Sequence, residues 1–316
     1  METKCTSKAT DAVRFQLVEL SRRTSLDIDS DTFDDARRDY LFNQAALATE
    51  EKYALVLQNY VQFESTLHGI ALNHLVFSAH KWSDFVDGIQ LVNGSLLNLL
   101  SSTKAYLDQV PQHLNDVFGN GSAQATAFEQ LTNKEFDERF EYRVISGLRN
   151  HLQHGDFPVK WLNFSSDWKT IEGEKESCAH KIAAFLSIDD LLKNDKIRAL
   201  TRDELKALGQ PRLDVKPLVR AYVSSIARLH CSVRSSIQQK THPAEERVRD
   251  LITRARDSAM EMPLGLSAVA FSEIGQVLEQ IPVFTDNIDR RKHLQKRSSV
   301  ITNLEKHFVS AEPIPT

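Results

Sequence analysis

An apolar side chain recurs at every fourth position between residues 136 and 152 of this chain. An α-helix turns once in 3.6 residues, so this spacing draws a slowly drifting apolar stripe along one side of a helix. Gly155 and Pro158 come soon after, and both residue types are common just beyond the end of a helix. We therefore expect a helix that ends near residue 154 and buries its stripe in the core. The stripe consists of Phe136, Phe140, Val144, Leu148 and Leu152.

Three polar side chains near the end of this helix point away from the stripe. At about 100° per residue, Arg149, Asn150 and His154 all fall outside the apolar side. His154 stands in the last turn, where the helix dipole favours a protonated imidazole. Proton transfer near neutral pH is therefore expected at this position.

The same side of the helix carries Arg139 and Arg143 and, near its middle, the small residues Ser146 and Gly147. Small residues let a neighbouring backbone approach closely. We therefore expect a basic face against which a second helix can pack.

The run RNHLQH at residues 149–154 resembles the R-(polar)-x-x-x-H signature of the HEPN superfamily, a group of small all-helical nucleases of bacterial toxin, abortive-infection and CRISPR-associated systems. An arginine five places before a histidine is common by chance, so context carries the resemblance. That context is the polar Asn150 in second place, the helix end and the long amphipathic helices before it. The resemblance implies a HEPN-like helical bundle and a metal-independent endoribonuclease, with catalytic Arg149, Asn150 and His154.

RNA cleavage of this kind needs few groups, because RNA carries its own nucleophile, the 2′-hydroxyl. In the roles that the resemblance implies, His154 is the general base or acid. Arg149 clamps the scissile phosphate and stabilises its developing charge. Asn150 orients the imidazole or the phosphate, and no metal or other cofactor is required.

Five further residues are candidates for supporting this site. His151 lies three positions before His154, and Arg143 lies on the basic face. In a HEPN-like domain the helix expected at 87–109 would pack beside the motif helix, and its second face is polar. The candidates on that face are Ser102, Tyr106 and Asp108.

The resemblance also implies partners and a setting. HEPN domains resemble two-fold dimers in which both motif helices meet in a shared cleft, so we expect a homodimer through the motif helix, with RNA as the substrate. A regulatory protein partner and a role in bacterial antiviral defence or toxin-type growth control are further expectations. The 3 cysteines lack metal-ligand spacing and no apolar run reaches the length of a membrane span, which favours a cytoplasmic protein with no membrane contact.

The fold class follows from the long periodic segments. Only 11 Gly and 9 Pro interrupt the 316 residues, which indicates a mainly α fold. The expected organisation has three parts. They are an N-terminal extension at 1–33, a HEPN-like helical domain at 34–240 and a helical C-terminal extension at 241–316.

Two segments depart from this plain helical pattern. Residues 11–22 allow a short helix within the N-terminal extension. Aromatic and β-compatible residues at 157–185 predict a small antiparallel β insertion after the motif helix. Its Trp161 or Trp168 could stack on RNA bases, although packing against the helices is the simpler role.

Charge gives no overall nucleic-acid signature, because the net charge is −4. Any RNA contact must come from a local basic face. The helix expected at 215–239 carries one such row, and a final basic helix contains DRRKHLQKRSS, residues 289–299. Such rows are usually solvated, but beside His154 the first would attract phosphate. Its members are Lys216, Arg220, Arg228 and Arg234.

Other functions stay open at this point. The chain could be a catalytically inactive HEPN-type module that binds RNA or a protein partner. A metal-dependent phosphohydrolase using His151, His154 and Asp156 fits poorly, because Gly155 separates the histidine from the aspartate. A di-iron site is also disfavoured, because Glu64 and His68 are one residue too far apart for a Glu-x-x-His pair.

Overall fold

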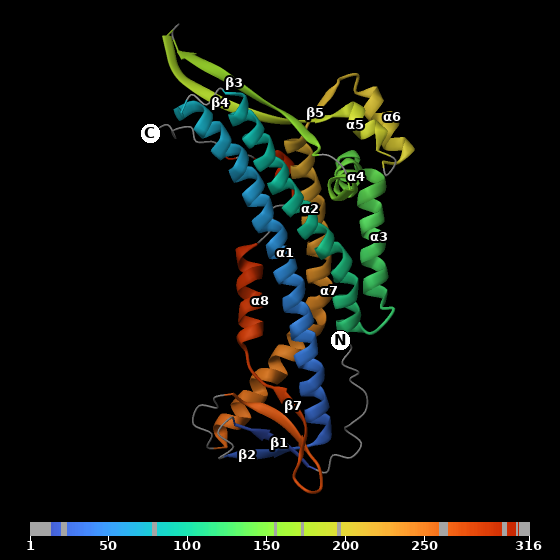
Figure 1. Ribbon diagram of the computed structural model, residues 1–316. Coiled ribbons are helices and arrows are strands. Elements are labelled where there is room, and N and C mark those ends of the chain that lie inside the picture. The colour runs from blue at the N-terminus through green and yellow to red at the C-terminus, as the bar shows by residue number, and fades with distance from the viewer. Residues whose placement is uncertain are drawn as a thin grey trace. The chain divides into compact units, whose positions relative to one another are not determined.

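The computed structural model is mainly helical, with small antiparallel sheets (Figure 1). The residues that the structure describes are 14–19, 24–77, 81–154, 157–171, 174–194, 197–258, 265–298, 302–307 and 309. Within these ranges, only the backbone is described at 150–154, 169, 171 and 174–176.

The chain forms two compact units, and each unit is assembled from separate segments. Unit 1 combines Met1–Glu51, Val110–Ala125 and Val233–Ser299. Unit 2 combines Lys52–Gln109, Thr126–Ser232 and Val300–Thr316. The boundaries expected at residues 33 and 240 do not coincide with this division, because segments from both ends of the chain belong to one unit.

The helices are long, as the periodicity predicts. The expected helix at 34–78 is α1, and the one at 87–109 extends through Pro111 to the end of α2. Helix α7 was expected to end near residue 239 but continues through Pro243. The helices are α1 (Ser30–Phe77), α2 (Trp82–Phe118), α3 (Ala123–Glu138), α4 (Phe140–His154), α5 (Ile188–Lys193), α6 (Ala199–Ala207), α7 (Val215–Asp257), α8 (Asp286–Arg297) and the 3-10 turn η2 (Leu304–Lys306).

The continuation of α7 has a packing explanation. Pro243 removes one backbone hydrogen bond but is itself exposed. Thr241 and Ala244 on either side of it are buried, at 2% and 0% exposure. Tertiary packing of the flanking turns therefore offsets the local cost of the proline.

Unit 1 contains a four-stranded antiparallel sheet in the order β2-β1-β6-β7. Its strands come from both chain ends, and Phe15 lies opposite Ile28 on one side and Ala270 on the other. The short helix expected at 11–22 and the wholly helical C-terminal extension are therefore wrong. The strands are β1 (Arg14–Val18), β2 (Ser25–Ile28), β6 (Ser267–Phe271) and β7 (Val277–Pro282).

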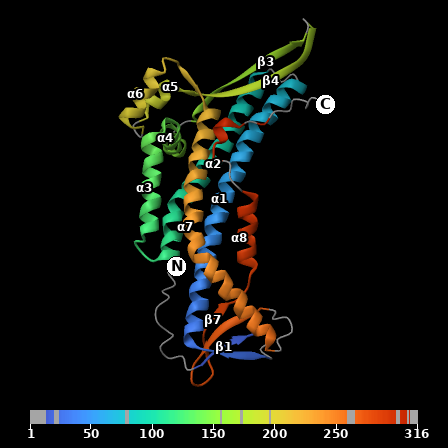
Figure 2. The same ribbon diagram turned by 180° about the vertical axis from the view of Figure 1, so that it is seen from behind.

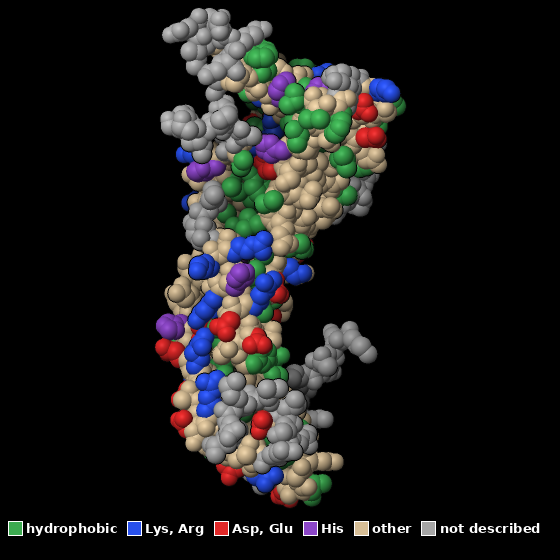
Figure 3. Space-filling view, turned by 90° about the vertical axis from the view of Figure 1, so that its left-hand side faces the viewer, with side chains coloured by type: hydrophobic (Ala, Val, Ile, Leu, Met, Phe, Trp, Pro, Cys, Tyr) green, Lys and Arg blue, Asp and Glu red, His purple; other side chains and the backbone are tan. Residues whose placement is uncertain are grey.

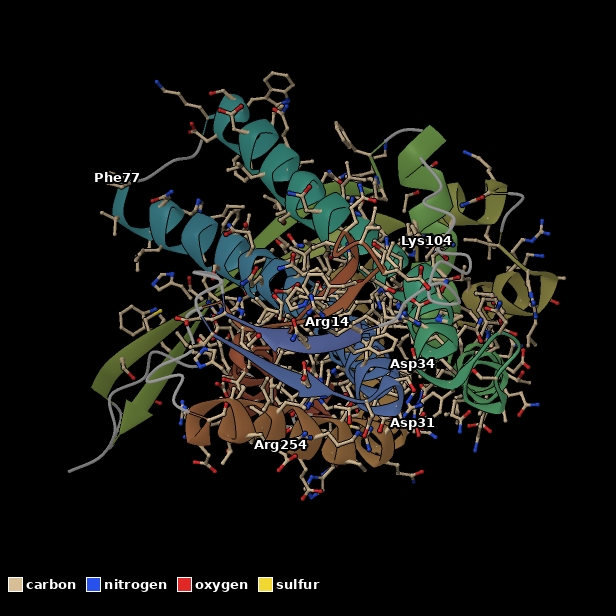
Figure 4. All side chains as sticks on the ribbon, turned by 90° about the horizontal axis from the view of Figure 1, so that it is seen from below. Arg14, Asp31, Asp34, Phe77, Lys104 and Arg254 are labelled. Carbon is tan, nitrogen blue, oxygen red and sulfur yellow. The ribbon has the colours of Figure 1, made fainter. Side chains whose placement is uncertain are left out.

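A hydrophobic cluster joins this sheet to the helices of unit 1. Leu17 of β1 and Phe33 of α1 are 0% exposed and belong to the same cluster as Leu251 of α7. Figure 4 looks at this end, and its labels Arg14 and Arg254 mark residues of β1 and of the last turns of α7. At the β7 edge of this sheet, the Arg37 guanidinium of α1 donates to the Glu279 carboxylate at 2.9 Å.

Unit 2 contains the β insertion predicted after the motif helix. Strands β3 (Val159–Ile171) and β4 (Glu174–Ser187) form a long antiparallel hairpin, and β5 (Arg212–Asp214) adds a third strand beside β4. Trp161 is 36% exposed, and the Arg212 guanidinium lies 4.3 Å from its ring centroid. This tryptophan packs within the sheet, whereas Trp168 is 54% exposed.

Arginine–glutamate pairs fasten α7 inside unit 2. The Arg220 guanidinium donates to both carboxylate oxygens of Glu64 in α1, at 2.7 and 2.8 Å. Arg228 makes the same two-bond contact with Glu135 in α3, at 3.0 and 2.8 Å. Burial alone would raise the pKa of both glutamates, but the arginines hold it below the ordinary value.

A third pair of this kind belongs to unit 1. Arg234 donates to both oxygens of Glu50, at 2.8 and 2.6 Å, and Glu50 is 3% exposed. Lys216, the remaining member of the row, donates to the Ile182 carbonyl. The three arginines of the α7 row therefore make interhelical contacts and Lys216 contacts β4, so the interpretation as a solvated or phosphate-attracting face is wrong.

A buried asparagine anchors the β insertion to α2. The Asn93 amide donates to the Val159 carbonyl and accepts from the Val159 N–H, both at 3.0 Å. Asn93 is fully buried, and it also donates to the Ile89 carbonyl at 2.9 Å. One side chain thus satisfies both backbone groups of the first residue of β3.

Replacing this asparagine should destabilise the protein through those two backbone groups. Asn93→Ala leaves the N–H and the C=O of Val159 buried without partners, and we expect the free energy of unfolding to fall by at least about 2 kcal/mol. Urea unfolding followed by circular dichroism measures this. Asn98→Ala, at an exposed position of the same helix, should change it by less than about 0.5 kcal/mol. Equal effects of the two substitutions would contradict the anchoring role.

Candidate functional site

Helix α4 ends at His154, as the sequence predicts. Val144 and Leu148 of its apolar stripe are fully buried. The side chains of Asn150, His151 and His154 lie outside the described part of the structure, although their backbone is helical. Arg149 and the residues around it form the described part of the candidate site.

Arg149 is the motif residue whose side chain the structure describes, and it is half-buried. No carboxylate among the described side chains forms an ion pair with it, in contrast to Arg220, Arg228 and Arg234 of α7. Its charge lowers the pKa of Tyr142 and of Tyr222, although burial raises both by more. An arginine without a counter-ion at a helix end can receive an anion.

Two buried tyrosines lie beside this arginine. The ring centroids of Tyr142 and Tyr222 are 5.0 Å apart, and the two side chains are 3% and 0% exposed. Burial raises the pKa of Tyr222 to about 12, while Arg149 and the Ser146 hydroxyl lower it by less. The Tyr222 hydroxyl nevertheless makes no hydrogen bond of normal geometry within the described structure. A buried hydroxyl of this kind needs an explanation.

Arg143 occupies a structural position that differs from the prediction. It is 6% exposed, and its guanidinium donates to both oxygens of Glu204 in α6, at 2.6 and 2.8 Å. It also donates to the Thr201 hydroxyl and to the carbonyls of Phe136 and Asp137. These bonds use all five N–H groups of the guanidinium, so Arg143 has no donor left for a phosphate.

The small-residue part of the same face is covered by the chain itself. The Asn194 amide donates to the Gly147 carbonyl at 3.3 Å. A Cβ at Gly147 would lie 2.7 Å from Ile197 Cγ1. Helix α6 packs beside α4 (Figure 2). The close approach expected of a second helix is thus made by the α5–α6 segment, and a motif-helix dimer has no access at Arg143 or Gly147.

The three candidates on α2 point elsewhere. The Tyr106 hydroxyl is 2.9 Å from His230 Nδ1, and both side chains are buried. The Ser102 hydroxyl donates to the Leu99 carbonyl, and the Asp108 carboxylate pairs with Lys104 of the same helix. Tyr106 and Ser102 therefore serve the core, and Asp108 serves the surface of α2.

A polar groove of about 620 Å³ lies between α1 and α2. Its one charged lining residue is Asp87, and a Cβ added at Gly94 would meet no atom within 4 Å. A groove without cations does not attract phosphate. It is lined by Gln62, Thr66, Asp87, Gln90, Leu91, Gly94, Ser95 and Asn98.

The structure bears on the metal alternatives as well. Glu64, considered above with His68, accepts hydrogen bonds from the Arg220 guanidinium and, at 3.2 Å, from the Tyr60 hydroxyl. His74 stacks on Phe164. No group of three metal-ligating side chains occurs within the described ranges. Among the helices in these ranges, none combines the length and the apolar character of a membrane span.

Sequence reasoning missed Tyr142 and Tyr222 as neighbours of Arg149. Both are buried, and a buried tyrosine is normally a core residue. The available signal was the tyrosine hydroxyl itself, which needs a partner when it is buried.

Comparisons of this chain with protein-family models, with curated proteins and with solved structures returned no match. The chemistry of the site therefore has to be inferred from its own residues.

The tight contact at Gly147 predicts opposite effects of alanine at two helical glycines. Gly147→Ala forces a methyl group against Ile197 and should lower the free energy of unfolding by roughly 1–3 kcal/mol. Gly94→Ala has open space and should raise it by about 0.5–1 kcal/mol. Thermal or urea unfolding compares the two. In a protein that already carries Ile197→Ala, the substitution Gly147→Ala should lower the free energy of unfolding much less than it does in wild type. If the losses caused by the two substitutions simply add, the contact between Gly147 and Ile197 is not tight.

The Tyr222 hydroxyl predicts a pH-dependent effect. An unfolded tyrosine has a pKa near 10, so the folded value of about 12 gives stability that is present below pH 10 and is lost as the pH rises from 10 to 12. Tyr222→Phe should leave the free energy of unfolding at pH 7 unchanged or slightly higher, because the hydroxyl is unpaired. It should also flatten the alkaline loss. A neutral-pH loss of about 1 kcal/mol or more, absent from Tyr40→Phe, would show that the hydroxyl is hydrogen-bonded.

Proposed function

We propose that this protein is a metal-independent endoribonuclease whose catalytic groups are Arg149, Asn150 and His154 at the end of α4. One observation carries the proposal. Arg149 has no carboxylate partner among the described residues, whereas Arg143 pairs with Glu204 and Arg220 pairs with Glu64. An unpaired guanidinium on the last turns of a helix that ends at His154 suits a transferring phosphoryl group.

The chemistry asks little more of the site. A base removes the proton of the RNA 2′-hydroxyl, whose oxygen attacks the adjacent phosphorus and displaces the 5′-oxygen. The products are a 2′,3′-cyclic phosphate and a 5′-hydroxyl. In this scheme His154 exchanges the proton, Arg149 neutralises the charge that grows on the non-bridging oxygens, and Asn150 orients the reacting groups.

Dimerisation remains part of the proposal, with a restricted geometry. The middle of the α4 polar face is covered at Arg143 and Gly147. Two motif helices could therefore share a cleft only through their last turns, around Arg149 and His154. The proposed setting, bacterial antiviral defence or toxin-type growth control with a regulatory protein partner, is supported only by the resemblance of residues 149–154.

The test is cleavage of end-labelled RNA in excess EDTA. Wild type should cut and leave 2′,3′-cyclic phosphate ends. His154→Ala should lose about 10²-fold or more in rate, because general acid–base catalysis contributes at least that much. Arg149→Ala should lose a similar factor. Arg149→Lys should recover only part of the rate, since a lysine cannot bind phosphate through two parallel bonds.

Matched controls separate catalysis from folding. His180→Ala removes an exposed histidine of β4 and should leave the rate unchanged, and all variants should keep the mass and melting temperature of wild type. Cleavage that is lost in EDTA, or that survives His154→Ala, would overturn the proposed mechanism. RNA binding without any cleavage would instead favour the catalytically inactive binding module.

A further inference from the structure

Helix α8 presents a cationic face to solvent. Its buried side includes Ile288 and Leu294, which are 1% and 3% exposed. Four basic side chains on the opposite side are exposed, and we call them the α8 cationic face. They are Arg290, His293, Lys296 and Arg297.

Helix geometry gathers these four residues into one strip. At 100° per residue they fall within about 120° of one another, and Arg290 and Arg297 are separated by roughly 10 Å along the helix axis. Figure 3 faces the side on which α8 lies in Figure 1, where Lys, Arg and His side chains are numerous, with Asp and Glu side chains among them. Asp286 and Asp289 lie on the same side in the first turn of α8, four residues before Arg290 and His293 respectively, whereas Lys296 and Arg297 lie in the last turn.

The basic side chains of this strip form no ion pairs within the described structure. Other cations on or near α8 have acidic partners: Arg291 and Lys292 both contact Glu245, and Arg249 pairs with Asp289 at 3.4 Å. Within the described structure, no carboxylate pairs with any residue of the α8 cationic face. A solvated and unpaired cation can exchange its counter-ions for a phosphate at little cost.

The chemistry of the exposed side selects the kind of partner. Its remaining exposed residues are Asp286, Asp289 and Lys292, so it carries no apolar side chain. A protein interface is normally centred on buried aromatic or aliphatic side chains. A membrane-surface helix likewise needs an apolar face to insert. A phosphate polymer needs neither, because it is attracted by charge alone.

We propose that the α8 cationic face binds the phosphate backbone of RNA without sequence preference. This deepens the proposed function and rests on it for the identity of the polymer: unit 1 would bind the RNA that the nuclease cuts. It also explains how a chain of net charge −4 retains a polyanionic substrate. The binding step itself requires no cleavage.

The experiment measures binding of a fluorescein-labelled single-stranded RNA of mixed sequence by anisotropy, between 50 and 200 mM salt. The full chain carries His154→Ala, so that RNA survives. The variant adds Arg290→Ala, Lys296→Ala and Arg297→Ala. Each lost phosphate contact lowers the slope of log affinity against log salt by about 0.7. We therefore expect the slope to shrink by about 2 and the affinity at 100 mM salt to fall at least tenfold.

A control variant that removes the same number of positive charges elsewhere tests whether their position on α8 matters. Lys134→Ala, Lys193→Ala and Lys206→Ala remove three exposed cations of unit 2, and the melting temperature of each protein should match that of the parent. A similar loss of affinity in this control would overturn the proposal, as would an unchanged slope in the α8 variant. Equal competition by polyglutamate and by RNA of the same charge would replace RNA with an acidic polypeptide as the partner.

The outcomes for α8 and for α4 are separable. If wild type does not cut RNA but the α8 variant still loses binding, the nuclease proposal fails and the α8 surface stands. If wild type cuts RNA and the α8 variant binds as its parent does, the nuclease stands and the α8 surface is overturned.

Discussion

Bidentate arginine–glutamate pairs join α7, a helix of 43 residues, to α1 and α3. The Arg234 and Glu50 side chains are only 17% and 3% exposed, so removing them from water costs several kcal/mol. The two parallel hydrogen bonds and the attraction between guanidinium and carboxylate offset that cost only when the two groups lie in one plane and face each other. Apolar contacts between helices tolerate a small displacement of one helix along the other, whereas such a pair does not. We infer that Arg220, Arg228 and Arg234 fix the axial position of α7 against its neighbouring helices and add little to the net stability.

Periodicity was sufficient to predict the helices but not their partners. The stripe ending at Leu152 predicts the end of α4 correctly, because such a stripe is a local property of the sequence, but its first member, Phe136, lies in α3. The strand at Arg14–Val18 could not be predicted in this way, since β1 exists through its pairing with β6 at the other end of the chain. At Pro243 a strong local signal for a helix end was overridden by packing of the turns around it.

The candidate site shows where reasoning from a helical wheel stops. A wheel separates the apolar stripe from the polar side, and it placed Arg149 and Arg143 together on the latter. It does not tell what covers the polar side. The α5–α6 segment covers Arg143 through Glu204 and leaves Arg149 without a carboxylate among the described residues. Two arginines six residues apart on one helix thus have opposite roles, one in the architecture and one available for chemistry.

The pairing of both chain ends in unit 1 has a consequence for synthesis on the ribosome. Arg37 and Glu279, joined across the edge of the sheet, are 242 positions apart. Strands β1 and β2 emerge early and must wait for β6 until nearly the whole chain has been translated. Meanwhile they present open strand edges, which are prone to pair with other chains. Nascent or prematurely terminated copies are therefore the form of this protein most exposed to aggregation and most dependent on chaperones.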